Sequence, residues 1–227
     1  MTTLPKAILI ATAVALSFGF ATVEPVKLSR KVKVGETYES KVMLVLYTSG
    51  LEINVDIKAR EKVLTVKGDG SYVIEETQYD QNITVSGQAQ PSPPDQSGEM
   101  TYSKTGEIVK VEFEQATDDT LGVANLMLII WPTKPADVGS KWEADTKSGA
   151  TIHHSYEILA RETVLGRDTF KISLEAGGSS SGDPSGKATV WVDIENGQTV
   201  KANGEMKNVP TAGRVMDRIT YTLTLVE

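Results

Sequence analysis

Apolar and polar residues alternate along most of the chain after Val34. Leu51, Ile53, Val55 and Ile57 alternate with charged or amide side chains, and the stretch from Ile219 to Leu225 repeats the pattern. Successive side chains of a β-strand point to opposite faces, so each such segment predicts a strand with one apolar face and one wet face. Such strands, joined by short turns, are typical of an antiparallel meander.

Turn residues separate these segments at short intervals. Gly68-Asp69-Gly70 and Asn196-Gly197 are examples, and an Asn-Gly pair favours a tight hairpin because both residues tolerate positive φ. We expect strands near 37–47, 51–66, 71–86, 98–103 and 107–114, and again near 141–147, 150–164, 168–176, 187–194, 198–206 and 215–226.

The two groups of strands match each other in sequence. The matched blocks are VGETYE at 34–39 with VGSKWE at 138–143, IKAREKV at 57–63 with ILARETV at 158–164, YVI at 72–74 with FKI at 170–172, and Ser-Gly at 97–98 with Ser-Gly at 185–186. Blocks that recur in the same order predict an internal duplication. We therefore expect a first β repeat at 34–117 and a second at 136–227.

The stretch Leu121–Pro132, LGVANLMLIIWP, belongs to neither repeat. Asp118 and Asp119 can cap a helix there, and Pro132 would end it. A helix that is apolar on almost every face must be covered, so the connection at 118–135 is expected to plug the sheet. The fold class predicted is all-β: an antiparallel open or half barrel of about 10–11 strands from an internal duplication, with one short apolar helix at the junction.

Residues 1–21 have the pattern of a secretory signal peptide. Lys6 lies in the positive region, Ala7 to Phe20 form the apolar region, and the small residues Gly19 and Ala21 suit cleavage after Ala21. The roughly 14 apolar residues fall short of the about 20 that span a membrane. We expect an exported protein, periplasmic or extracellular after cleavage near Ala21, with a linker at 22–33 and membrane contact only through an uncleaved signal.

Composition narrows the list of partners. The formal net charge is −7 over 227 residues, which argues against nucleic acid as a partner. The chain has no cysteine, which excludes disulfides, a thiol nucleophile and thiolate metal sites. Motifs for a nucleophile elbow, a phosphate loop or a zinc helix are absent from the sequence as well.

The two histidines, His153 and His154, are adjacent in sequence. Neighbours on a strand point to opposite faces, so they do not jointly bind one ion unless a bulge intervenes. We expect no metal site and no cofactor, a surface role for His153, and for His154 either a hydrogen-bonded interior position or a cavity-lining one. The recurring pairs Arg60-Glu61 and Arg161-Glu162 are expected to form structural ion pairs.

Three segments carry a resemblance to a known family. They are VGETY at 34–38, Trp131–Trp142 with its Pro-x-x-Pro-x-x-x-Gly-x-x-Trp centre, and Gly186–Val200 with its Asn-Gly hairpin. With these motifs the chain resembles an exported bacterial β-rich domain family of unknown function, which implies no catalytic residues. Its architecture is also similar to periplasmic lipoprotein carriers, whose curved sheet wraps a helical plug over an apolar cavity.

Three functional hypotheses follow. The first is a non-enzymatic cell-envelope protein whose curved sheet binds an apolar small molecule or lipid. The second is a structural or interaction module with a filled core. The third is a hydrolase that uses carboxylates or His154. No catalytic residue is assigned, and the residues expected to line a ligand cavity are Ile53, Val55, Leu126, Ile130, Ile152, His154 and Tyr156.

Overall fold

A computed structural model describes residues 24–113, 121, 124–146, 151–178, 180, 182–211 and 214–226. The predicted signal peptide at 1–21 lies outside these residues. Within the described ranges, no helix has both the length and the apolar character needed to cross a membrane.

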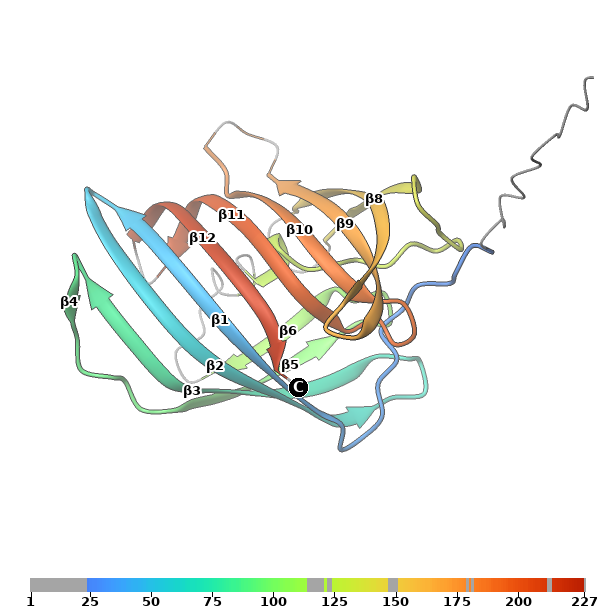
Figure 1. The fold of residues 1–227 in the computed structure, drawn as a ribbon, viewed down its shortest axis with the longest axis horizontal. Helices are drawn as coiled ribbons and strands as arrows, with labels where there is room; N and C mark the ends of the chain where they lie inside the picture. Colours follow the sequence, from blue (N-terminus) through green and yellow to red (C-terminus); the bar gives the residue numbers. More distant parts are fainter. Residues whose placement is uncertain are drawn as a thin grey trace, which may run out of the picture.

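The described residues form twelve strands in a single antiparallel sheet (Figure 1). The strands are β1 (Thr37–Thr48), β2 (Leu51–Val66), β3 (Tyr72–Val85), β4 (Gln88–Ala89), β5 (Gln96–Tyr102), β6 (Ile108–Phe113), β7 (Lys141–Asp145), β8 (His153–Val164), β9 (Arg167–Gly177), β10 (Ser185–Asp193), β11 (Thr199–Thr211) and β12 (Arg214–Val226). The prediction of an all-β antiparallel fold is confirmed, and the two-residue strand β4 is an addition to the predicted set.

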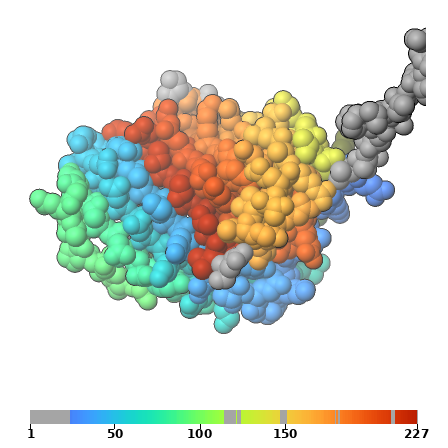
Figure 2. All heavy atoms as spheres, viewed as in Figure 1, coloured from blue at the N-terminus to red at the C-terminus, as the bar shows by residue number. Residues whose placement is uncertain are grey.

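The sheet is curved and unclosed, with the order β6-β5-β3-β2-β1-β12-β11-β10-β9-β8-β7. The C-terminal strand β12 lies between β1 and β11, so it joins the two halves of the chain through ladders on both sides. The space-filling view shows this junction as bands from the N-terminal and C-terminal parts of the chain lying side by side (Figure 2).

Irregularities of the ladders recur in both halves. A β-bulge falls between Val63 and Thr65 on β2, and another between Ile158 and Ala160 on β8. Gly35 donates to the carbonyl of Val63 at 2.8 Å, and Gly139 donates in the same way to Ile158 at 2.8 Å.

These pairings make Val63 the equivalent of Ile158, whereas the sequence match aligned Ile57 with Ile158. The two hairpins turn at different distances from the shared bulge, at Lys67–Gly70 in one and Leu165-Gly166 in the other. The Ala-Arg-Glu match therefore falls at different ladder positions. The duplication itself stays a prediction.

The connecting segment is only partly helical. Leu121 and Ala124–Leu126 are helical, Met127 lies in a turn, and Leu128–Trp131 have no regular secondary structure, so the prediction of a helix up to Pro132 was wrong in its second half. The reason is that the backbone there bonds to the surrounding strands and turns instead of to itself. Trp131 N–H, for example, donates to the Thr105 carbonyl at 2.8 Å. We call Ala124–Trp131 the plug.

Candidate functional site

The plug is fixed to the inner face of the second half of the sheet by side chains of β7 and β8. The Tyr156 hydroxyl accepts a bond from Ile130 N–H at 3.1 Å and donates to the Leu128 carbonyl at 3.1 Å. Trp142 Nε1 donates to the Ile130 carbonyl at 2.8 Å, and its ring stacks on Tyr156 at 4.8 Å between centroids. Buried backbone groups need such partners, so these side chains hold the plug in its extended form.

His154 holds the other end of the plug. It is only 2% exposed, its Nε2 lies 2.8 Å from the Asn125 carbonyl oxygen, and its Nδ1 lies 3.2 Å from that of Ile152. The shorter contact places a proton on Nε2. His154 therefore takes the hydrogen-bonded interior position, one of the two alternatives expected from the sequence. His153 bonds to Asp145 at 2.7 Å on the exposed face, as expected of a surface residue.

The seven residues predicted to line a ligand cavity fall into two groups. Leu126, Ile130, Ile152, His154 and Tyr156 come together in the buried core around the plug. Ile53 and Val55 lie apart from them, half-buried on β2. None of the seven lines the interior cavity that the structure contains.

That interior cavity lies between the plug and the first half of the sheet. Its volume is about 330 Å³, at the lower end of the range for small-molecule sites. Its lining is mostly apolar and aromatic, including Tyr38, Tyr72, Ile74, Met100, Tyr102, Met127, Leu128, Tyr221, Leu223 and Leu225. Four charged residues also line it: Arg30, Glu39, Glu61 and Glu76.

Arg30 reaches the cavity from the segment before β1. This segment is not a free linker, because Val26 pairs with Ala136, Leu28 is 2% exposed, and Lys31 N–H donates to the Asn196 carbonyl at 2.8 Å. The guanidinium carbon of Arg30 lies 4.7 Å from the centre of the Tyr38 ring. Its Nη1 and Nη2 are buried and have no hydrogen-bond acceptor among the described residues.

Glu61 and Glu76 face each other across the β2–β3 ladder. Burial raises the pKa of Glu61 from 4.5 to about 7, with a further contribution from Glu76, while Arg30 acts in the opposite direction. Burial also raises the pKa of Glu76, although Gln78 Nε2 donates to its carboxylate at 2.7 Å. Two carboxyl groups in one apolar wall cannot both ionise cheaply, so Glu61 takes up a proton near neutral pH.

The expected ion pair between Arg60 and Glu61 does not form. Arg60 bonds instead to Glu39 at 2.9 Å on the outer face, and Arg161 likewise bonds to Asp168 instead of Glu162. Neighbouring residues of a strand point to opposite faces, which separates each arginine from the glutamate beside it. The sequence signal for Glu61 was its place in the apolar phase of β2; nothing in the pattern marked Arg30.

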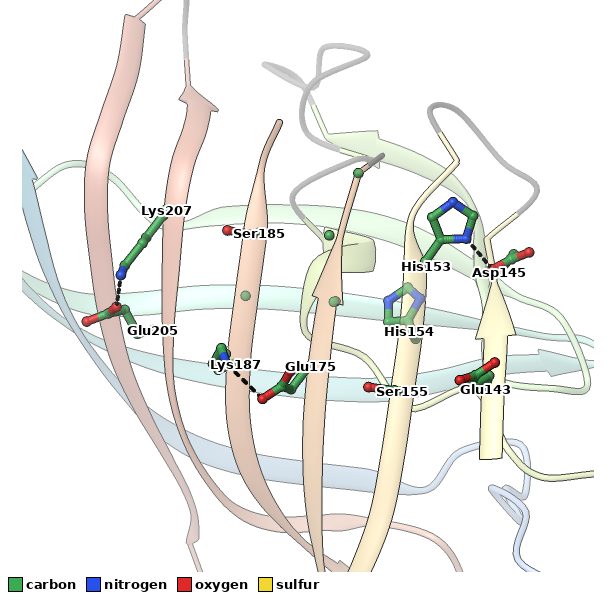
Figure 3. Close-up of a pocket in the computed structure, with 14 residues that line it drawn as sticks. Glu143, Asp145, His153, His154, Ser155, Glu175, Ser185, Lys187, Glu205 and Lys207 are labelled. Carbon is green, nitrogen blue, oxygen red and sulfur yellow. Dashed lines mark hydrogen bonds and ion pairs between the residues drawn. The ribbon is translucent and has the colours of Figure 1, made fainter. Parts of the chain in front are cut away.

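A second, open depression of about 560 Å³ lies on the outer face of β7–β11 (Figure 3). Its walls carry two ion pairs, one between strands, with Lys187 Nζ 2.8 Å from Glu175, and one along β11, with Lys207 Nζ 3.2 Å from Glu205. Exposed pairs of this kind contribute about 0–1 kcal/mol each and keep the outer face hydrated. The cavity on the inner face, with its apolar, aromatic and charged lining, is therefore the better candidate for a binding site.

The fold and this cavity define the protein as an open antiparallel half barrel with an interior plug. No protein-family model matches the chain, and no curated protein matches its sequence. A structure of lipid–protein interactions in lipovitellin matches 86% of this chain with a TM-score of 0.50 and 11% identity. The match spans only 25% of the lipovitellin chain.

Two bacterial structures are also similar. An exported protein with a YmcC-like fold from Bacteroides fragilis matches 88% of this chain and 100% of its own, with a TM-score of 0.36 and 10% identity. A LolA superfamily protein from Nitrosomonas europaea matches 87% and 86%, with a TM-score of 0.22 and 10% identity.

Proposed function

We propose that this protein is an exported, non-enzymatic protein of the cell envelope that binds an apolar ligand or lipid inside its curved sheet. The observation that carries the proposal is the cavity of about 330 Å³ between the plug and the first half of the sheet. The second half is filled by the plug, whereas the equivalent space of the first half is open. A ligand bound there would fill the open space between the plug and the first half of the sheet.

An apolar surface continues from the cavity along the sheet. Leu223 and Tyr221 line the cavity on β12 and pair with Val42 and Leu44 on β1, which are only half-buried. Val42 in turn pairs with Ile57, and Leu44 pairs with Val55, on β2. Covering such aliphatic groups gains about 25 cal/mol for each Å² removed from water, which favours a ligand with a hydrocarbon chain. We propose that Val55 and Ile53, which do not line the cavity itself, contact a ligand that extends from it along this surface.

The proposal is tested by titrating the protein with 1-decanol in a calorimeter. An alkyl probe suits the aliphatic surface, and the lipid–protein interactions of the similar lipovitellin structure support the same choice. We expect saturable binding with a negative heat-capacity change, because apolar surface is buried. Leu44→Asp on the inner face should abolish binding, while Met43→Asp, at a position 57% exposed, should leave it intact. A titration without saturable heat would overturn the proposal.

Two alternatives make different predictions for the same protein. A structural module with a filled core is favoured by the packing around the plug, and it requires that decanol does not bind. A hydrolase is favoured by the Glu61–Glu76 pair, since adjacent carboxyl groups whose pKa values are raised by burial can serve acid–base chemistry. It requires turnover of an ester or glycoside that Glu61→Gln abolishes.

A further inference from the structure

The two halves of the sheet place different side chains at equivalent inner positions. In the first half the ladders align Tyr38, Glu61 and Glu76; in the second half they align Trp142, Tyr156 and Leu174. Glu61 thus occupies the position of Tyr156, the residue that binds the backbone of the plug. At this position the first half carries an ionisable residue, whereas the second half carries the residue that anchors the plug.

Among the groups that line the cavity, Arg30 is short of hydrogen-bond acceptors. Two of its buried guanidinium nitrogens have none among the described residues, although the guanidinium lies over the Tyr38 ring and its charge acts on Glu61. An unpaired buried guanidinium is costly, and a group that supplies acceptors for both nitrogens relieves that cost. The planar fork of an arginine matches the two oxygens of a carboxylate.

We propose that Arg30 and Glu61 form the head-group site for a single-chain amphiphile that ends in a carboxylate. This inference rests on the proposed function, and it names the chemical class of its ligand. The carboxylate accepts hydrogen bonds from Arg30 Nη1 and Nη2, and the protonated carboxyl group of Glu61 donates to it. The alkyl chain follows Leu225 and Leu223 towards Val42 and Leu44.

The charges around the site should make the affinity for a carboxylate depend on pH. The groups that face the site are Arg30 from the N-terminal segment, Tyr38 and Glu39 of β1, Glu61 of β2, Tyr72 and Glu76 of β3, Tyr102 of β5 and Tyr221 of β12. Burial raises the pKa of the four tyrosines and Arg60 lowers the pKa of Glu39, so these five groups keep their charge state in this range. Glu61, whose pKa is about 7, loses its proton as the pH rises from 6 to 8, and its negative charge then repels a bound carboxylate.

The experiment compares decanoate with 1-decanol, which has the same chain and an uncharged head. Arg30→Gln should weaken decanoate binding about tenfold or more, the size of a lost charged hydrogen bond, and should change decanol binding by less than about twofold. The matched control is Arg60→Gln, which removes the same charge from the outer face of β2. It should leave decanoate binding within about twofold of that of the unmodified protein.

A second measurement does not depend on the folding of the Arg30 variant. In the unmodified protein, decanoate affinity should fall about fivefold or more between pH 6 and pH 8. In Glu61→Gln it should not change with pH, and decanol affinity should not change with pH in either protein. Equal effects of Arg30→Gln on both probes, or a decanoate affinity that is independent of pH, would overturn this inference and leave the proposed function standing. Failure of both probes to bind would overturn the proposed function itself.

Discussion

Glu61 is an acidic residue on the apolar face of β2, and the free energy by which it destabilises the fold depends on pH. Its pKa of about 7 lies above the ordinary 4.5, so the folded state holds the proton more tightly than the unfolded state does. The free energy of unfolding therefore falls as the pH rises from 4.5 through 7 and levels off above that. Glu61→Gln should be more stable than the unmodified protein at pH 8, by about 1–3 kcal/mol, and nearly equal at pH 4.

Urea denaturation at the two pH values measures this difference. Glu39→Gln is the control with the opposite sign, because Arg60 lowers the pKa of Glu39 and the substitution removes a favourable pair. It should be no more stable than the unmodified protein at pH 8. Equal stability of Glu61→Gln and the unmodified protein at pH 8 would show that Glu61 is hydrated and ionised without cost.

Single residues were only partly predictable from the sequence. The alternation placed His154 on the inner face, and the structure confirms its burial and its hydrogen bonds. The same alternation put Glu61 in the apolar phase, but the neighbouring Arg60 suggested a local ion pair. Arg30 carried no signal, because its position depends on contacts between the N-terminal segment and the hairpin turn at Asn196-Gly197, far away in sequence.

At the scale of elements, the Tyr156 hydroxyl group is an anchor that bonds to two backbone groups of the plug. Tyr156→Phe leaves the Ile130 N–H and the Leu128 carbonyl without their partner inside the core. The expected loss is about 1–3 kcal/mol in the free energy of unfolding, measured by urea denaturation. Tyr47→Phe keeps the ring that packs under Arg218 and should change stability by less than about 0.5 kcal/mol. Equal effects of the two variants would contradict the role given to Tyr156.

The N-terminal segment before β1 also contributes to the free energy of unfolding. Leu28 belongs to the main core cluster and is 2% exposed, so Leu28→Ala should cost about 2–5 kcal/mol. Leu159→Ala, at a position 45% exposed, is the control and should cost less than about 1 kcal/mol. Thermal unfolding curves of the two variants make the comparison. A small loss at Leu28 would mean that the segment is the linker predicted from the sequence.

Elements with a regular pattern were predicted better than irregular ones. Alternation and turn residues located the strands, since a strand has a fixed period of two. The plug was expected to stay helical up to Pro132 because propensity was the only guide. Its extended half is set by Tyr156, Trp142 and Thr105, which offer backbone partners that no local pattern encodes.

At the scale of the molecule, β12 makes one body of the two halves. Its inner residues Ile219, Tyr221 and Leu223 pack on the main core, and the strand pairs with β1 of the first half. A sheet continuous across this seam should unfold in a single transition. Tryptophan fluorescence reports Trp131, Trp142 and Trp191 around the plug and second half, whereas circular dichroism reports all strands.

We expect the two signals to give the same urea midpoint, and Ile219→Ala to lower both midpoints equally. Ile219 is 5% exposed, and its truncation should cost about 2–5 kcal/mol. Val215→Ala, at a position 57% exposed on the same strand, should leave both midpoints nearly unchanged. If fluorescence and circular dichroism separated in Ile219→Ala, the halves would be independent folding units. The plug would then connect two folding units, because Tyr156 and Trp142 bind it from the second half and Thr105 binds it from the first.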